Sequence, residues 1–376
     1  SGVERVMLKS SKSIRTLGAI LALPCAGIVS GDPVVDGSLD AIYGGPSVVQ
    51  NTQTNFGDND DPDIGVANGS ELNMGDAMIR DGVLYIMLAG NLESNFNKVE
   101  VFIDARDGGQ NMLRNDNPDV NYNGLNRMGP NPDDPKGVGL TFDEGFAPDL
   151  YVTLGGGLTK TKEGEVYVFY ADAAELRTEG GGNGAYLGSG GAGPDAVLEG
   201  SNGISIAVNN SNVGGVSWGT GISCGDGVTT GIEIGVPLYL FDWDGPQNVE
   251  DAAICAFVNS SNHDYVSNQV LGGIGGGDNF GEPRLVDFNT VDGDQFFVAG
   301  GVAEPCPDVV GACCTGTDCS IGTEEDCLDL GGSYLGDSSS CDDEPCAEDC
   351  PSDITGDGAV DVTDLLQLIA DWNCGL

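Results

Sequence analysis

Cationic side chains and histidine are scarce in this chain. It carries 14 Lys and Arg against 59 Asp and Glu in 376 residues, for a formal net charge of −45, and its one histidine is His263. Nucleic-acid binding depends on Lys and Arg that neutralise phosphates, so we expect no nucleic-acid partner, and anionic membranes are disfavoured for the same reason. A single histidine excludes a zinc site with three histidine ligands. Because the apolar content of 40% is ordinary, we expect a folded chain rather than a disordered acidic tail.

Long apolar runs are also missing. The apolar stretch at residues 17–29 follows four basic residues and is too short to cross a bilayer, so we expect no membrane span. A basic segment, a short apolar run and small residues near its end are typical of a secretory signal. We therefore interpret residues 1–30 as a signal peptide with Met7 as its start, and we expect a secreted, extracellular or cell-surface protein. A lipid anchor at Cys25 and a short buried helix are the alternatives.

Helical periodicity is scarce between residues 31 and 302. Short runs with period-two alternation stand between turns rich in Gly, Asn and Asp, and Val99, Val101 and Ile103 share one face of such a run. This pattern predicts an all-β fold, an antiparallel, jelly-roll-like β-sandwich. Strands are expected at residues 83–88, 99–104, 150–154, 165–170, 203–208, 231–236, 253–258 and 295–298, and the remaining parts of 145–164 and 180–193 stay unassigned.

Three motifs carry a resemblance to a known family. They are VVDGSLD at residues 34–40, DGVLY at 81–85 and VEVFID at 99–104. Together they resemble the opening of family 9 carbohydrate-binding-like β-sandwiches, which implies a glycan-binding module. The segment 34–298, with the GACC motif at 311–314, is also similar to secreted proteins of planctomycete-type bacteria, which implies an exported protein.

Tryptophan, the residue best suited to stack on a sugar ring, occurs three times. A planar ring covers the apolar face of a pyranose, while polar side chains bond its hydroxyls. Trp218 and Trp243 are therefore the candidate ligand-binding platforms, and Trp372 belongs to the C-terminal segment. The alternative interpretation is that both candidates anchor the core or the loops.

Residues 353–364, with the sequence DITGDGAVDVTD, have the spacing of a calcium loop. Oxygen-bearing side chains stand at loop positions 1, 3, 5, 9 and 12, and glycine stands at position 6, where such a loop turns sharply. Apolar residues then recur at spacings of three and four, which predicts a helix with an apolar stripe. An Asp- and Gly-rich turn before an ordinary helix is the alternative. The expected calcium ligands are Asp353, Thr355, Asp357, the carbonyl of Ala359, Asp361 and Asp364.

The loop and the residues after it resemble one repeat of a type I dockerin, over residues 353–372. The resemblance implies that residues 351–376 form a half EF-hand loaded with calcium, and that this unit docks on cohesin domains. Dockerins usually carry two repeats, whereas the sequence shows one, so a cohesin-like partner and self-assembly are both open. Two further acidic loops, residues 58–63 and 115–123, are either calcium sites or solvated loops.

Cysteines concentrate in residues 303–350, which we expect to form a disulfide-rich stalk. Zinc is the alternative for this segment. Cys224 and Cys255 are expected to pair within the sandwich, unless they are two buried thiols. A Cys350–Cys374 bridge would clasp the ends of the calcium unit. Six cysteines of the stalk are expected to pair among themselves, with fifteen possible connectivities: Cys313, Cys314, Cys319, Cys327, Cys341 and Cys346.

Catalysis has little support in the sequence. His263 followed by Asp264 could serve a nucleophile as base and orienting carboxylate, but an exposed loop histidine is the favoured interpretation. Among 59 acids, none is marked by its neighbours as half of a hydrolytic carboxylate pair. We therefore expect a non-catalytic, calcium-binding extracellular protein whose sandwich binds glycans and whose C-terminal repeat serves attachment. The alternatives are a structural subunit of an extracellular layer or filament, and a polysaccharide hydrolase.

Overall fold

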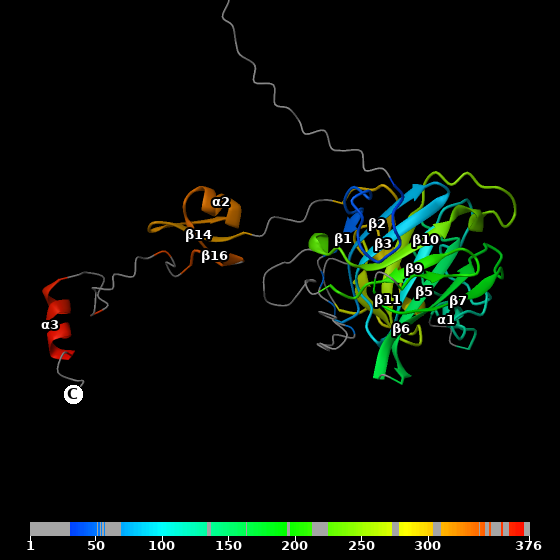
Figure 1. The fold of residues 1–376 in the computed structure, drawn as a ribbon, viewed down its shortest axis with the longest axis horizontal. Helices are drawn as coiled ribbons and strands as arrows, with labels where there is room; N and C mark the ends of the chain where they lie inside the picture. The colour runs from blue at the N-terminus through cyan, green and yellow to red at the C-terminus, as the bar shows by residue number, and fades with distance from the viewer. Residues whose placement is uncertain are drawn as a thin grey trace, which may run out of the picture. The chain divides into compact units, whose positions relative to one another are not determined.

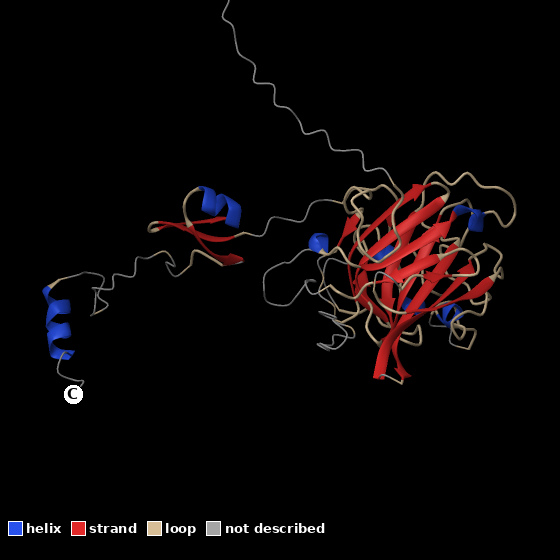
Figure 2. Ribbon diagram, in the orientation of Figure 1, coloured by secondary structure: helices blue, strands red, loops and turns tan. Residues whose placement is uncertain are grey.

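The computed structural model describes most of residues 31–376, and strands dominate it (Figure 2). The predicted signal peptide, the acidic loop 58–63, Trp218 and Cys224 lie outside the described residues. Also outside the description are Cys306, Cys350 and Cys374. The residues outside the description are 1–30, 51, 53, 55, 57–68, 134–136, 163, 194–195, 213–224, 273–277, 304–309, 338, 343–345, 347–354, 356–360 and 372–376.

Two antiparallel sheets form the body of the chain between residues 32 and 303 (Figure 1). The first sheet has the strand order β1-β2-β3-β10-β9-β8, and the second has the order β12-β11-β4-β5-β6-β7, with β13 beside β11. The first comprises β1 (Val48–Val49), β2 (Glu71–Arg80), β3 (Val83–Asn91), β8 (Leu198–Glu199), β9 (Ser205–Val208) and β10 (Gly231–Pro237). The second comprises β4 (Asn95–Asp104), β5 (Leu150–Thr161), β6 (Gly164–Glu175), β7 (Gly184–Gly190), β11 (Ala253–Asn259), β12 (Val266–Val270) and β13 (Phe297–Val298).

The main core lies between these two sheets. Val99, Val101 and Ile103 of β4 face it from the second sheet, as their alternation predicts, and Ile232 and Ile234 of β10 face it from the first. Since successive side chains of a strand point to opposite faces, one apolar set per strand fills the space between the layers. The prediction of a mostly β chain with antiparallel sheets is confirmed.

A second apolar cluster covers part of the outer face of the second sheet. It joins Phe102 of β4, Tyr151 of β5 and Phe257 of β11 to aromatic residues of the long loops, among them Phe142 and Phe288. These loops carry the short helices α1 (Gly124–Arg127), η3 (Pro283–Leu285) and η4 (Phe288–Thr290). The central strands of this sheet are therefore buried on both faces at one end.

The β2–β3 hairpin turns at Asp81 and Gly82. Both residues have positive φ, 48° and 81°. This backbone matches the right-handed twist of the flanking strands, and Asp-Gly is a favoured pair for it. The turn fixes the register in which Arg80 pairs with Val83.

The eight expected strands are all present, but several bounds differ from the prediction. β5 and β6 extend through the glycine-rich stretch 155–164 that stayed unassigned, and the tip of this hairpin projects beyond the other strands (Figure 1). β7 lies in the other unassigned stretch. β2 and β12 have no counterpart in the prediction.

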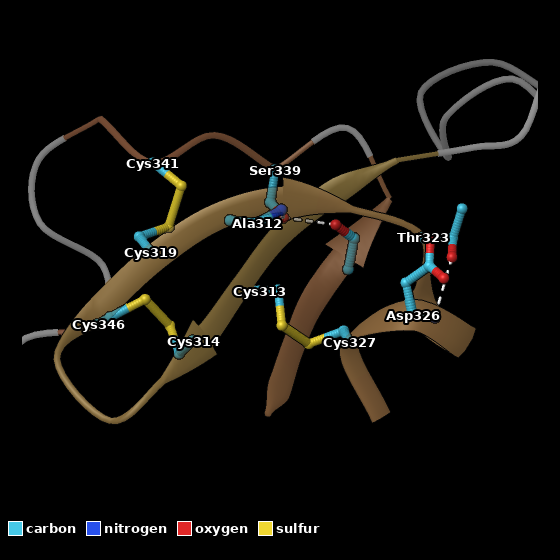
Figure 3. Close-up of a disulfide and its surroundings, with 11 residues drawn as sticks. Ala312, Cys313, Cys314, Cys319, Thr323, Asp326, Cys327, Ser339, Cys341 and Cys346 are labelled. Atoms are coloured by element: carbon cyan, nitrogen blue, oxygen red, sulfur yellow. Dashed lines mark hydrogen bonds between the residues drawn. A yellow bond between two sulfur atoms is a disulfide. The ribbon is translucent and has the colours of Figure 1, made fainter. Parts of the chain in front are cut away.

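The cysteine-rich segment is a small unit of one sheet and one helix. Its strands β14 (Gly311–Thr315), β15 (Asp318–Gly322) and β16 (Ser333–Asp337) are antiparallel, and α2 (Glu324–Asp329) follows β15. Thr323 caps α2, because its hydroxyl oxygen accepts from the Asp326 N–H at 3.0 Å. The six predicted cysteines do pair among themselves (Figure 3), as Cys313–Cys327, Cys314–Cys346 and Cys319–Cys341.

Cys255 corrects one prediction. It is a free thiol, 1% exposed, on β11, so it does not pair with Cys224. Its side chain belongs to the outer apolar cluster, where burial raises the pKa of the thiol well above its usual value. Cys255 is therefore a buried thiol, which was the alternative to a disulfide at this position.

The longest described helix is α3 (Val362–Asp371), which begins within the last three positions of the predicted calcium loop 353–364. Its residues Val362, Leu365, Leu366, Leu368 and Ile369 are each between 43% and 65% exposed. Within the described residues, none of the helices combines the length and the apolar character that crossing a membrane requires.

Three buried carboxylates tie loops to the sheets. Glu233 accepts from the Asp36 N–H at 2.9 Å and from the Tyr43 hydroxyl at 2.8 Å. Asp149 accepts from the Arg106 N–H at 3.0 Å, and Asp76 from the Ser47 hydroxyl at 2.9 Å. Burial raises the pKa of Glu233 and of Asp149 to about 7, and that of Asp76 to about 6.

These carboxylates predict that the folded chain loses stability as the pH rises from 5 to 8. Each holds its proton in the folded state at a pH where the unfolded state has released it, so folding takes up protons in this window. We expect the unfolding midpoint to be lower at pH 8 than at pH 5 by at least about 3 °C, measured by calorimetry.

The triple variant Asp76→Asn/Asp149→Asn/Glu233→Gln separates this effect from general repulsion among the acids. Its midpoint should vary less with pH than that of the native chain. Glu282, whose pKa the guanidinium groups of Arg127 and Arg284 lower despite its burial, stays ionised across the window and contributes a constant. An equally steep pH dependence in the triple variant would contradict the assignment.

Candidate functional site

Polar side chains occupy the outer face of the second sheet where the outer apolar cluster ends. Lys98 pairs with Gly155, and Gly155 with Tyr170, across β4, β5 and β6. Two residues further along the strands, Glu100 lies opposite Thr153, and Thr153 lies opposite Asp172. Since alternate residues share a face, these side chains continue the rows that Phe102 and Tyr151 begin.

Two adjoining cavities of about 590 and about 600 Å³ lie over this polar face. Both are lined by Phe96, Lys98, Asn121 and Tyr122, and we call the joint cavity the outer groove. At one end it continues along the α1 loop, and at the other along β6 and β7. The remaining lining residues are Asn123, Gly124, Asn126, Arg127, Ser261, Asn262 and His263 in the first cavity, and Tyr170, Asp172 and Tyr186 in the second.

Solvent-exposed aromatic rings border the outer groove. Phe96 is 45% exposed, Tyr186 is 59% exposed and Tyr122 is fully exposed. Glycines of β5 make room beside them: a Cβ at Gly157 would lie 2.2 Å from the Phe96 ring, and one at Gly155 would lie 2.5 Å from the Lys98 ammonium. Any side chain at either glycine would therefore displace part of the groove lining.

The backbone is strained around the outer groove. Six non-glycine residues in the described part of the chain have positive φ, and five of them line the groove. Such conformations cost about 1–3 kcal/mol each and cluster at functional sites. Asparagine tolerates this conformation, but Phe and Tyr rarely adopt it. The five residues are Phe96 (66°), Asn121 (45°), Tyr122 (56°), Asn123 (64°) and His263 (56°).

A buried contact between Glu100 and His263 supports the floor of the outer groove. The Glu100 Oε1 atom lies 2.6 Å from His263 Nδ1 and accepts from the Asn259 side chain at 3.1 Å, while Oε2 accepts from the Tyr151 hydroxyl at 2.6 Å. His263 is 2% exposed, which corrects the expectation of an exposed loop histidine. Its ring packs on Gly124, where a Cβ would lie 2.1 Å from the ring carbon Cδ2.

Electrostatics explains how Glu100 can be fully buried. Burial by itself would raise the pKa of Glu100, but the attraction of the His263 ring and the hydrogen bonds from His263 and Tyr151 outweigh burial and lower it. The carboxylate therefore stays ionised inside the protein, in contact with the His263 ring. In turn, burial and the negative charge of Glu100 raise the pKa of the Tyr151 hydroxyl well above its usual value.

Asn121 connects this buried pair to the groove. Its side-chain Nδ2 donates to Asp172 Oδ2 at 2.8 Å, so its Oδ1 atom is the one that faces His263 Nε2 at 3.0 Å. Both ring nitrogens of His263 thus face oxygen atoms. Asn121 thus holds the loop that carries Tyr122 to β6 and to His263.

Trp243, one of the two expected platforms, does not line the outer groove. It is half-buried against the main core, and the Arg106 guanidinium lies 4.2 Å from its ring centroid. Arg106 in turn forms an ion pair with Asp244 at 2.7 Å. Trp243 therefore anchors its loop, which is the alternative interpretation of this residue.

Several side chains of the loop 115–123 are bonded within the protein. Asp116 forms an ion pair with Arg114 at 2.6 Å, and Asn117 accepts from the Gln110 side chain at 2.7 Å. The part of the chain that the structure describes holds no group of three or more His, Cys, Asp or Glu arranged for a metal ion. These contacts order the loop beside the groove, and calcium binding there stays a prediction.

Half of the expected ligands of the C-terminal calcium loop are described, and they converge. Asp364 is 3% exposed, and its Oδ1 atom accepts from the Thr355 N–H and hydroxyl, both at 3.0 Å. Its Oδ2 atom accepts from the Asp361 N–H at 2.8 Å. Loop positions 3, 9 and 12 thus meet at the start of α3, which fits a loop that wraps a hard cation. Asp353, Asp357 and Ala359 lie outside the described residues.

The sequence drew attention to His263 and to the loop 115–123, but it did not single out the aromatic residues of the groove as binding residues. Phe96, Tyr122 and Tyr186 come from three distant segments, and only the sheet register brings them together. Two local signals were available. One is the glycine run 155–157 inside a strand, where missing side chains often mark a close approach by another group. The other is the Asn-Tyr-Asn sequence at residues 121–123, since asparagine favours left-handed backbone.

Comparison with family models, with curated proteins and with solved structures finds no match to this chain. The evidence for function is therefore the chemistry of the outer groove. The groove is distinguished by exposed aromatic rings, strained backbone and the buried Glu100–His263 contact below them.

Replacing His263 tests how far the groove depends on the buried pair. His263→Ala leaves the Glu100 carboxylate buried without its partner, so we expect a loss of about 3–5 kcal/mol in the free energy of unfolding, measured by urea denaturation. The exposed groove residue Ser261 is the control, and Ser261→Ala should change stability by less than about 0.5 kcal/mol.

The double variant Glu100→Gln/His263→Gln completes the test. It removes the buried carboxylate charge together with its imidazole partner and keeps similar volumes, so it should be more stable than His263→Ala. If His263→Ala unfolds like the native chain, the pair does not support the groove.

Proposed function

We propose that this protein is an exported, non-catalytic binding protein whose sandwich holds a glycan in the outer groove and whose C-terminal unit binds calcium for attachment. One observation carries the glycan proposal. Phe96 and Tyr122 keep strained backbone conformations while their rings are 45% and fully exposed. Burial within the chain does not offset that strain, so contact with a ligand is the explanation we favour.

The chemistry of the outer groove suits a sugar. Aromatic rings cover the apolar faces of pyranoses, and amide, carboxylate and ammonium groups bond the hydroxyls. Phe96, Tyr122 and Tyr186 supply the rings, and Asn121 and Asp172 supply polar groups between them. Two adjoining cavities of about 590 and about 600 Å³ would accept neighbouring units of an oligosaccharide.

The positions of the carboxyl groups near the groove favour glycan binding over glycan hydrolysis. A glycosidase needs two carboxyl groups that face the bond to be cleaved. Glu100 is fully buried below the groove and is bonded to His263, Tyr151 and Asn259. This leaves Asp172 as the carboxylate that lines the second cavity.

A serine hydrolase is disfavoured by the sheet topology. Residues 215–219, GVSWG, have the Gly-x-Ser-x-Gly spacing of a nucleophile motif and lie outside the described residues. That motif acts at the end of a strand in a parallel sheet flanked by helices. The described strand pairs of this chain's sheets are antiparallel.

Export and attachment have separate support. Three disulfides within residues 313–346 suit an oxidising, extracellular compartment. Thr355, Asp361 and Asp364 would hold calcium with the expected ligands of the loop that lie outside the described residues, and the bound ion would cross-link the loop to α3. The exposed leucines and isoleucine of α3 suit attachment to a partner, as in the dockerin-like arrangement.

Removing groove aromatics tests the glycan proposal. We expect Tyr122→Ala and Tyr186→Ala each to weaken binding of the selected polysaccharide by about tenfold, since each removes a stacking surface. Binding is measured on a polysaccharide array and then by calorimetry. Tyr239→Ala is the matched control, because Tyr239 is 60% exposed and does not line either cavity. Unchanged affinity in both groove variants would remove the groove as the site.

Calcium binding is tested by calorimetric titration of the full chain. We expect Asp364→Ala to weaken the tightest calcium site by more than about tenfold, because the variant loses the carboxylate that joins the loop to α3. Asp371→Ala, at the other end of the same helix, should leave the titration unchanged. Identical heats for Asp364→Ala and the native chain would show that calcium does not bind this loop.

A further inference from the structure

Lys98 lies on the floor of the outer groove. Its side chain extends from β4, is 7% exposed and lines both cavities. Gly155 of the neighbouring strand makes the space, since a Cβ there would lie 2.5 Å from Nζ and 3.0 Å from Cδ of the lysine. A buried ammonium is thus placed where a ligand in either cavity would meet it.

Lys98 is a buried cation that the described residues leave without a hydrogen-bond or ion-pair partner. Among the described residues, no acceptor forms a hydrogen bond or ion pair with its ammonium. Lys162, the other described lysine without an ion pair, lies exposed at the tip of the β5–β6 hairpin. The remaining described cations each have a carboxylate within 3.8 Å: Arg80, Arg106, Arg114, Arg127, Lys160, Arg177 and Arg284.

Two carboxylates near Lys98 bond other groups instead. Glu100 bonds His263 and Tyr151 below the groove floor, and Asp172 bonds the Asn121 amide at 2.8 Å. Both attract the ammonium from a distance, yet burial still lowers the pKa of Lys98. A desolvated ammonium without a hydrogen-bond acceptor is costly, and a direct contact with an anion would remove that cost.

We propose that Lys98 binds the carboxylate or sulfate of an acidic sugar held in the outer groove. This inference rests on the proposed glycan function and names the ligand class. The sugar ring lies against Phe96 or Tyr122, which border the same two cavities, and Asn121 and Asp172 bond its hydroxyls. The anionic group then makes a charge-assisted contact that a neutral sugar cannot make.

The direct test is lysine NMR on the full chain. The sequence has six lysines, so spectra with ¹³C at lysine Cε are simple, and Lys98→Met identifies the Lys98 signal. The probes are sodium glucuronate, glucose 6-sulfate and glucose. We expect a saturable shift of the Lys98 signal with glucuronate, with glucose 6-sulfate or with both, and none with glucose. The signals of Lys160 and Lys162 should stay in place.

A second measurement uses polymers. Lys98→Met should weaken binding of the preferred acidic polysaccharide by about tenfold or more, while affinity for a neutral polysaccharide changes less than about threefold. Lys162→Met is the matched control and should match the native chain. Comparing a uronate polymer with a sulfated one shows which anion Lys98 prefers. If Lys98→Met does not fold, Arg substitutions of the other five lysines assign the Lys98 signal by elimination, and the NMR titration of the native chain decides.

The results separate this inference from the glycan proposal. If neither anionic probe shifts the Lys98 signal, or if glucose shifts it equally, Lys98 is not an anion site, even where the groove binds neutral glycans. If the anionic probes shift Lys98 but Tyr122→Ala and Tyr186→Ala leave polysaccharide binding intact, the anion site stands and the aromatic groove does not.

Discussion

The buried contact between Glu100 and His263 is the interaction on which the groove depends. Glu100 collects hydrogen bonds from Tyr151 on the next strand, from Asn259 on the strand at its other side and from the histidine in a loop. Through Nε2, the same histidine holds Asn121, and Asn121 holds Asp172. One desolvated carboxylate thus orders three strands and two loops, because leaving it unpaired inside the protein would be costly.

The sequence could predict the strands whose apolar residues alternate, and it missed strands whose buried side chains are polar. β4 shows the first case, since Val99, Val101 and Ile103 all face the main core. β12 shows the second: Ser267 and Gln269 are buried, and Gln269 bonds the Gln50 side chain at 2.6 Å. Such residues satisfy their polar groups through distant partners, so a pattern of hydrophobicity along the chain does not reveal them.

The site was harder to predict than the fold, because its parts meet only through sheet register. The few tryptophans suggested Trp243 as a platform for a sugar, yet this ring packs against the Arg106 guanidinium and anchors its loop. The exposed rings are Phe and Tyr from a strand end, a loop and an edge strand. The cysteines show the same limit of sequence-based prediction. Their close spacing in the sequence predicts that the six pair among themselves, whereas which cysteine pairs with which depends on how β14 packs against α2 and β16.

Charge in this protein is arranged by the scarcity of cations. With 14 Lys and Arg against 59 Asp and Glu, the described arginines all meet a carboxylate. Lys162 lies exposed at a hairpin tip, whereas a buried lysine can avoid a carboxylate only where the fold holds nearby carboxylates in other bonds. Glu100 and Asp172 are held in that way beside Lys98. An acidic chain can therefore keep one ammonium available, and it does so in the cavity that exposed aromatic rings surround.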